Sequence, residues 1–199
     1  MRSLLKKYFS VFGFMLVMSL SLFGNDLNVI TNSMHQKVNA IMHILRNEDL
    51  LRCEKDSKIG VISEGMFDYT LMSRLSVGKK IWKKATKEEK ADFIRLFEMR
   101  MKKSYIEKSH LLTDEKVTVH DAVQVKATRI HLSVIINGKD KDTKITYKYY
   151  HAKNKEWLIY DVEIAGISIL KTYRAQFAEV LRKGDIQEII NQLQATSSS

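Results

Sequence analysis

The chain has 199 residues, 45% of them apolar and 28% charged, which is enough to build one domain with a buried core. It contains no proline and one cysteine, Cys53, which excludes proline-rich linkers, an internal disulfide framework and CxxC metal or redox sites. Lys and Arg total 33 against 23 Asp and Glu, giving a formal net charge of +10.

Residues 1–24 have the pattern of a secretory signal peptide. Basic residues near the start are followed by an apolar run from Phe9 to Leu20 and then by small residues. The run is shorter than the roughly 20 residues that a membrane-spanning helix needs. We therefore expect export, cleavage of the leader and a mature single domain over residues 25–199, with an uncleaved anchor as the alternative.

The mature chain begins with the 3.6-residue period of helices. Apolar residues recur every three or four positions over 27–52 and again over 57–77. Gly78 is placed to end the second helix as a left-handed cap. These patterns predict two amphipathic helices, the first of which forms an N-terminal helical lobe with the second.

The strongest local signal is a capping box made by Thr86 and Glu89. It follows a predicted helical turn at 80–84 that carries Trp82. The box predicts a helix that begins there and runs to about residue 107 with an aromatic stripe. Aromatic and methionine residues of this kind fill cores, but they also line ligand cavities, and periodicity does not distinguish the two.

After His110 the period changes to two, which indicates strands. Apolar residues are odd-numbered over 117–127 and even-numbered over 130–136. We interpret this change of parity near 127–128 as a β-bulge that bends the strand.

Further alternation over 145–149 and 158–164 predicts two more strands, separated by polar turns at 137–142 and 151–155. Short connections of this length favour an antiparallel meander. The order of helices, strands and helices predicts an α+β protein with helices packed on a curved antiparallel sheet.

Gly166 separates the last strand from a predicted helix that Gly184 stops. A final helix is expected over 185–193, opened by Asp185, with a frayed tail over 195–199.

Motifs of the common catalytic and nucleotide-binding sites are missing: there is no GxSxG, GxGxxG, Walker A, HExxH or EF-hand loop. The six histidines are never three or four residues apart. Four carboxylates could supply a pair for acid–base chemistry, but nothing in their spacing requires it: Glu64, Asp68, Asp161 and Glu163. We assign no catalytic residue, no metal ligand and no cofactor.

Four lysines, Lys79, Lys80, Lys83 and Lys84, flank Trp82. Nucleic-acid interfaces use such residues, but the export signal argues against that partner. Two interpretations remain, a solvated basic face and a surface that meets anionic phospholipid headgroups or an acidic protein partner.

Two longer patterns complete the sequence evidence, one between Gly65 and Phe97 and one between Trp157 and Phe177. Their residues are Phe67, Asp68, Met72, Gly78, Trp82 and Thr86, then Tyr160, Asp161, Val162, Gly166, Ile167, Ser168, Tyr173, Arg174 and Phe177. In order and spacing they resemble the MlaC family, also described as toluene-tolerance or organic-solvent-resistance auxiliary proteins. The resemblance covers about residues 30–194.

The resemblance implies a periplasmic phospholipid carrier that is not an enzyme and needs no cofactor. Such a carrier shuttles lipid between an outer-membrane lipoprotein and porin complex and an inner-membrane MCE/ABC transporter, and so maintains outer-membrane lipid asymmetry. The implied fold is a nuclear-transport-factor-like curved sheet with an added helical lobe. We expect a monomer with no nucleic-acid partner.

The lipid tails are then expected between the concave face of the sheet and the helices. The expected wall consists of apolar residues on the inferred inward faces: Phe67, Leu71, Leu75, Phe93, Phe97, Leu132, Val134, Tyr147, Tyr149, Val162, Ile164, Ile167, Tyr173 and Phe177. The alternative is a non-carrier interaction domain, or a small hydrolase or isomerase, on the same cone-shaped scaffold.

Overall fold

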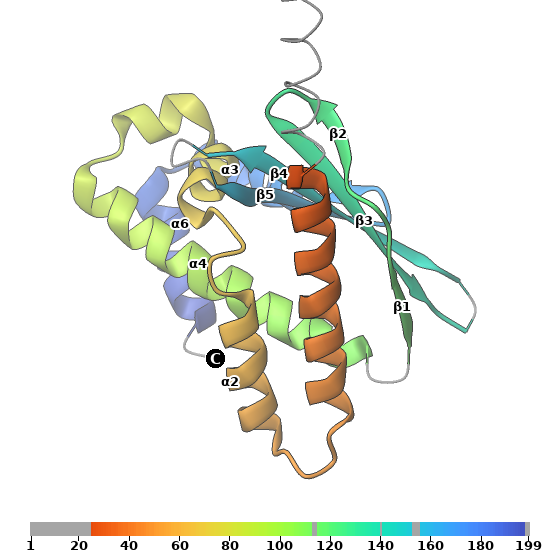
Figure 1. The fold of residues 1–199 in the computed structure, drawn as a ribbon. Helices are drawn as coiled ribbons and strands as arrows, with labels where there is room; N and C mark the ends of the chain where they lie inside the picture. Colours follow the sequence, from red (N-terminus) through yellow and green to blue (C-terminus); the bar gives the residue numbers. More distant parts are fainter. Residues whose placement is uncertain (1–24, 113–114, 140, 153–155, 198–199) are drawn as a thin grey trace, which may run out of the picture.

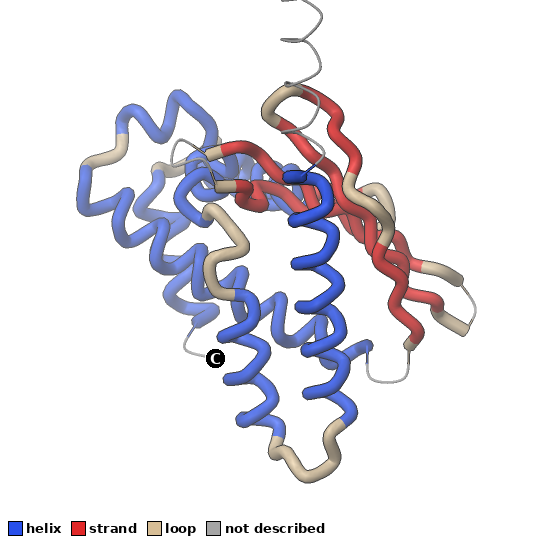
Figure 2. Tube along the Cα trace, viewed as in Figure 1, coloured by secondary structure: helices blue, strands red, loops and turns tan. Residues whose placement is uncertain are grey.

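The computed structural model of the protein describes residues 25–112, 115–139, 141–152 and 156–197. Its helices gather on one face of an open antiparallel sheet (Figures 1 and 2). This confirms the α+β class and the packing of helices on a curved sheet. The predicted leader, residues 1–24, lies outside the described residues. Within them, no helix combines the length and the apolar character needed to cross a bilayer.

The N-terminal lobe is a helical hairpin made by a helix over residues 25–46 and by α2 (Arg52–Ser63) (Figure 1). The predicted boundaries here are wrong, because the chain leaves the helical conformation again at 64–68. Gly65 has a φ of 70°, which favours glycine, and the Asp68 carboxylate accepts a hydrogen bond from the Leu71 N–H at 2.7 Å. These two residues end one helix and begin the next, α3 (Tyr69–Lys84).

Gly78 interrupts α3 instead of capping it. Its φ of 80° is positive as predicted, but its ψ of 160° lies outside the left-handed helical region. The chain therefore kinks at Gly78 and resumes a helical turn that carries Trp82.

The capping box at the start of α4 (Lys87–Ser109) is confirmed. The Glu89 N–H donates to Thr86 Oγ1 at 3.1 Å, and the Thr86 N–H donates to Glu89 Oε2 at 2.7 Å. The helix runs two residues past its predicted end and continues into a 3₁₀ turn, η1 (His110–Leu112).

Among the described residues, the sheet has six strands in the order β1-β3-β4-β5-β6, with β2 also paired to β3. The strands are β1 (Lys116–Val119), β2 (Val123–Lys126), β3 (Arg129–Asn137), β4 (Thr143–His151), β5 (Trp157–Ile164) and β6 (Ile167–Ser168). The antiparallel meander predicted for β3 to β5 is confirmed.

The predicted position of the bulge is wrong: the chain reverses at 127–128, where β2 and β3 form a hairpin, and the irregular register lies between Gln124 and Lys126 of β2. Both β1 and β2 pair with β3, as the partners Val119↔Val134 and Val123↔His131 show. A reversal and an inserted residue can each change which positions, odd or even, face the core. The same sequence pattern therefore fits both.

The side of β5 that faces away from β4 pairs with β6 near its end and, at Ile159, with the segment between α2 and α3. The Asp68 N–H donates to the Ile159 carbonyl at 3.0 Å, and the Ile159 N–H donates to the Met66 carbonyl at 2.9 Å. Phe67 thus forms a parallel bridge with Ile159, which fixes it against the sheet.

Two helices complete the chain, α5 (Ile169–Leu181) and α6 (Ile186–Ser197). The Asp185 carboxylate accepts from the backbone N–H groups of Gln187 and Glu188 at 2.9 and 3.3 Å, as expected for a helix start. The helix extends to Ser197, so the tail predicted to fray from residue 195 is helical for its first part.

Buried apolar residues form two clusters. The main cluster lies between the sheet and α3 to α6 and includes Phe93, Phe97 and Phe177. The smaller cluster lies in the helical hairpin and consists of Ile41, Met42, Leu45 and Ile59.

Candidate functional site

A cavity of about 560 Å³ lies between the sheet and the helices. Val38, Tyr105 and Val117 pack against both hydrophobic clusters, and all three line this cavity. The cavity is therefore the gap between the two clusters. Its volume is within the range of about 300–1,000 Å³ that is usual for small-molecule pockets.

The sheet forms one wall through alternate residues of its three long strands. Val134 is the register partner of Ile145, and Tyr147 is the partner of Val162, so these side chains share one face. The sheet residues of the lining are Val117, Val134, Ile136, Thr143, Ile145, Tyr147, Val162 and Ile164.

The opposite wall comes from the N-terminal helix and the second half of α4. Residues three or four apart on each helix face the cavity, as one helical stripe requires. They are Val38, Ile41 and Met42 from the first helix and Met101, Ser104, Tyr105, Lys108 and Ser109 from α4, with Phe67, Tyr69 and Ile169 closing the gap.

Charged residues line only part of the cavity among the described residues. Lys108 lies near the end of α4, Lys139 and Lys141 lie in the β3–β4 connection, and Glu115 precedes β1. The three lysines are exposed and Glu115 is half-buried. This end of the cavity is therefore open to solvent and carries an excess of positive charge.

Tyrosine hydroxyls supply polar groups farther inside. Burial raises the pKa of Tyr105 to about 12. Burial and the neighbouring Tyr105 raise the pKa of Tyr147 well above its usual value. Both phenols are therefore protonated at neutral pH, and each has a hydrogen to donate.

The residues predicted as walls are divided by the structure. Phe67, Val134, Tyr147, Val162 and Ile164 line the cavity. Those buried in the main cluster outside the lining are Phe93, Phe97, Leu132, Tyr149 and Phe177, while Leu71, Leu75 and Tyr173 are half-buried and Ile167 is 66% exposed. The exposed position of Ile167 follows from the turn between β5 and β6, which the two-residue alternation does not describe.

Sequence reasoning missed the helical half of the lining, including Ile41, Met42, Met101 and Tyr105. Their signal was present, because they belong to apolar stripes with helical spacing. That spacing shows which side of a helix is buried, but not what the helix is buried against.

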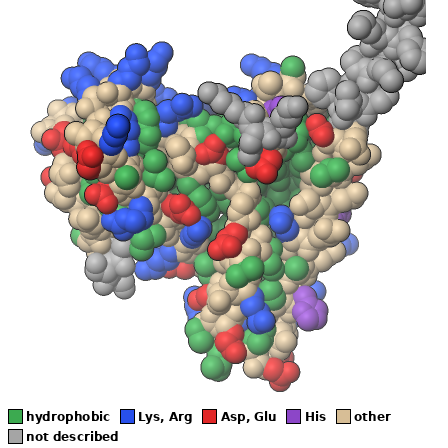
Figure 3. Space-filling view, turned by 60° about the vertical axis from the view of Figure 1, so that its left-hand side comes forward, with side chains coloured by type: hydrophobic (Ala, Val, Ile, Leu, Met, Phe, Trp, Pro, Cys, Tyr) green, Lys and Arg blue, Asp and Glu red, His purple; other side chains and the backbone are tan. Residues whose placement is uncertain are grey.

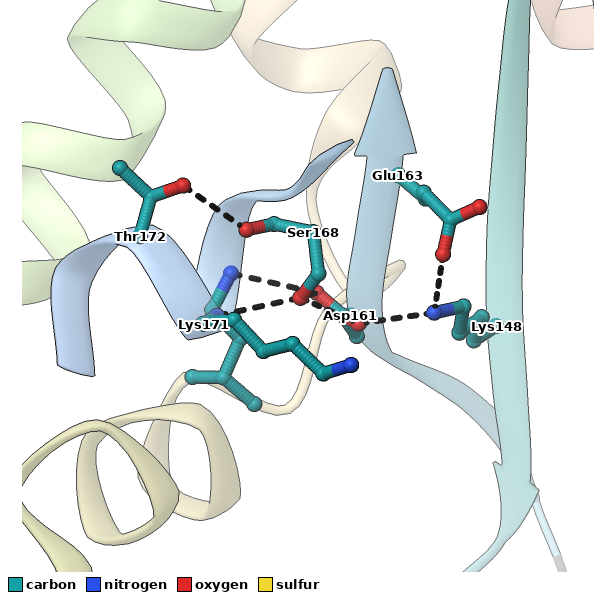
Figure 4. A network of polar contacts seen from close by, with 7 residues as sticks. Lys148, Asp161, Glu163, Ser168, Lys171 and Thr172 are labelled. Carbon is teal, nitrogen blue, oxygen red and sulfur yellow. Dashed lines mark hydrogen bonds and ion pairs between the residues drawn. The ribbon is translucent and has the colours of Figure 1, made fainter. Parts of the chain in front are cut away.

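The Asp161 and Glu163 carboxylates face away from the cavity and are already paired (Figure 4). Buried Asp161 accepts hydrogen bonds from Ser168 Oγ at 2.8 Å and from the Leu170 N–H at 3.2 Å, which fixes the start of α5. Lys148 Nζ lies 3.2 Å from Asp161 Oδ2 and 2.7 Å from Glu163 Oε2. This network therefore joins β4, β5 and α5.

The other two candidate carboxylates, Asp68 and Glu64, have different surroundings. Asp68 caps α3 and accepts a hydrogen bond from the Tyr150 hydroxyl, while Glu64 is exposed. In the part of the chain that the structure describes, no three His, Cys, Asp or Glu side chains come together to hold a metal ion.

A groove of about 680 Å³ lies on the other face of the sheet. Its lining is rich in polar and charged side chains, including His120, His131, Lys148 and Glu163. Burial, with Lys148 nearby, lowers the pKa of His131. The groove lacks the continuous apolar surface of the inner cavity, so the inner cavity is the better ligand site.

Together, the fold and the cavity define an α+β binding protein with an internal, mainly apolar ligand site. The sequence matches the MlaC protein family model over residues 35–195, and the chain belongs to this family. The predicted resemblance is confirmed.

The structure is also similar to that of a phospholipid-binding protein from Ralstonia solanacearum, solved in complex with a phospholipid. The two have a TM-score of 0.69 and 18% sequence identity, with 83% of this chain and 94% of the other covered. At this identity the similarity concerns the fold. No curated protein matches the sequence.

Proposed function

We propose that this protein binds a phospholipid in the inner cavity and carries it through the periplasm. The observation that carries the proposal is an apolar cavity between the sheet and helices of a MlaC family member. The lipid in the Ralstonia solanacearum protein of similar fold supports the same class of ligand. A binding protein, not an enzyme, fits a cavity whose walls are mainly aliphatic and aromatic.

The energetics explain why a lipid needs such a carrier. Two acyl tails contain about 30 CH₂ groups, and exposing each to water costs about 0.8 kcal/mol, or roughly 20–25 kcal/mol in total. Free diffusion between two membranes is therefore negligible. A cavity that covers the tails and leaves the headgroup near solvent lowers this cost while still allowing release.

The finer proposal has three parts. Residues 1–24 direct export, and residues 25–199 act as a monomeric domain. This domain shuttles lipid between an outer-membrane lipoprotein and porin complex and an inner-membrane MCE/ABC transporter. The proposed docking surface consists of four lysines on the second half of α3, all of them exposed: Lys79, Lys80, Lys83 and Lys84. Figure 3 shows Lys and Arg side chains over much of the visible face, with several together at its upper left.

The experiment combines native mass spectrometry with a transfer assay. The full chain is expressed with its leader, purified without detergent and weighed, and it is then mixed with donor and acceptor vesicles that contain a fluorescent phospholipid. We expect a cleaved protein with about one phospholipid mass added, and transfer that scales with protein concentration. A folded protein without extractable lipid and without transfer would favour the interaction-domain alternative.

A further inference from the structure

Three of the cavity-facing residues of α4 differ in polarity along the helix: Lys108 is charged, Tyr105 is polar and Met101 is apolar, with Ser104 and Ser109 also in the lining. Lys108, Tyr105 and Met101 all line the cavity. At a rise of about 1.5 Å per residue, Lys108 and Tyr105 are about 4.5 Å apart along the helix axis, and Tyr105 and Met101 about 6 Å apart. A phospholipid has the same order of groups over similar distances: a phosphate, then ester carbonyls, then hydrocarbon.

Two of the inner polar groups have no protein partner. Among the described residues, the hydroxyls of Tyr105 and Tyr147 make no hydrogen bond, although Tyr147 is only 8% exposed. In that same part of the chain, the only side-chain polar atom sealed in protein without a partner is Ser73 Oγ. The two hydroxyls are therefore not sealed in protein, and they open toward the cavity that both residues line.

Their rings are held in place by packing. The Tyr105 ring makes an edge contact with Phe67 at 5.8 Å, and Tyr147 lies in the main cluster between Val162 and Leu132, its register partners. A hydroxyl that faces a cavity and has no protein partner usually meets a bound ligand or water. An apolar tail offers no acceptor, whereas an ester carbonyl does.

We propose that the Tyr105 and Tyr147 hydroxyls donate hydrogen bonds to the ester carbonyl oxygens of the bound phospholipid. The phosphate then lies toward Lys108, and the tails run past Met101. This inference rests on the proposed function and narrows its substrate class: the protein selects diacyl phospholipids over dialkyl ether phospholipids with the same headgroup and chain length. An ether oxygen is a weaker acceptor and has no carbonyl to reach the phenols.

The test compares Tyr105→Phe, Tyr147→Phe and the double variant with the wild-type protein. Each substitution removes one hydroxyl oxygen and keeps the aromatic ring. Binding of matched diester and diether phosphatidylglycerol is measured by competition with a fluorescent lipid. One neutral hydrogen bond contributes about 0.5–1.5 kcal/mol, so we expect each substitution to weaken diester binding roughly 2–12-fold. Diether binding should not change.

Tyr149→Phe is the matched control. Tyr149 is on the same strand and 7% exposed, but it does not line the cavity. This variant should keep the wild-type ratio of diester to diether affinity, and melting temperatures confirm that all variants fold.

The outcomes separate the two levels of the proposal. Equal affinity of the wild-type protein for diester and diether lipids would overturn the tyrosine assignment while leaving the carrier function intact, and that measurement needs no variant. A diester preference that survives the double substitution would also overturn it. Failure to bind lipid of either linkage would overturn the proposed function itself.

Discussion

The two halves of α4 use the same kind of apolar stripe in opposite ways. In the first half, Phe93 and Phe97 are fully buried, and their rings lie 5.6 and 6.2 Å from that of Phe177. In the second half, Met101 and Tyr105 continue the stripe but border a cavity. The filled half faces α5 and α6, and the hollow half faces the gap between the two hydrophobic clusters. Whether a stripe becomes core or cavity therefore depends on what is packed against it.

The largest expected difference between the halves is in stability. Phe97→Ala leaves a void in a closely packed aromatic group and should lower the free energy of unfolding by about 3–5 kcal/mol. Met101→Ala should lower it by less, because its side chain already borders empty space. Urea denaturation of both variants measures the contrast. Equal losses would show that the second half of α4 is packed as tightly as the first.

A second contrast compares neighbours on one face of β3. Leu132 is fully buried outside the lining, whereas Val134 lines the cavity. Leu132→Trp should overpack the core and lower the free energy of unfolding by about 1–3 kcal/mol. Val134→Trp should place its ring in the cavity, with a smaller loss of stability and less bound phospholipid.

The measurements are phospholipid phosphorus per mole of folded protein and melting temperature, taken on both variants. Val134→Trp protein that carries as much lipid as wild type would contradict the assignment of this cavity to the lipid tails.

The smallest effect concerns the outer face of the sheet, where polar groups are paired. The hydrogen bond from Lys148 lowers the pKa of Glu163 below its usual 4.5. Burial opposes the charge on Lys148, but its bonds to Glu163 and Asp161 raise its pKa above 10.5. The pair therefore stabilises the fold between these values: the carboxylate contribution is lost as pH falls through the lowered pKa, and the lysine contribution as pH rises through the raised one.

With Lys148→Met, the melting temperature should fall less between neutral and acidic pH than it does in the wild-type protein. Melting temperatures from about pH 3 to pH 7 follow the change, because the pH slope reports the difference in bound protons between the folded and unfolded states. Lys144→Met, at an exposed lysine on the same strand, is the control and should keep the wild-type slope. Identical slopes for the two variants would show that the network contributes nothing to acid stability.

Helix starts and strand faces were predictable where residues close together in the sequence determine them. The Thr86 capping box and the alternation in β3 to β5 correspond to structure nearly residue by residue. The break at 64–68 was missed although Gly65 and Asp68 mark it, because the apolar spacing continues through the segment. The hairpin at 127–128 was missed because a bulge gives the same change of parity.

The site was predictable only in part, for a different reason. Val134, Tyr147 and Val162 were found because a strand face has one side toward the helices. The N-terminal helix and Tyr105 were not found, because the cavity exists only where two separately built clusters fail to meet. The separation between the two clusters is set by tertiary packing, and the apolar periodicity of a helix does not depend on it.

Because of the parallel bridge between Phe67 and Ile159, some parts of the cavity wall are attached to the sheet more firmly than others. Phe67 is held to the sheet by the backbone hydrogen bonds of its two neighbours. The N-terminal helix is tied to the sheet region by side chains: Thr31 Oγ1 accepts from the Ala122 N–H at 2.9 Å, and Asp26 Oδ2 accepts from Trp157 Nε1 at 3.1 Å. In hydrogen-exchange terms, the amides of Asp68 and Ile159 belong with the slowly exchanging centre of the sheet. We therefore expect the amides of the N-terminal helix to exchange faster than those of Asp68 and Ile159, although Ile30 and Met34 pack this helix into the main cluster.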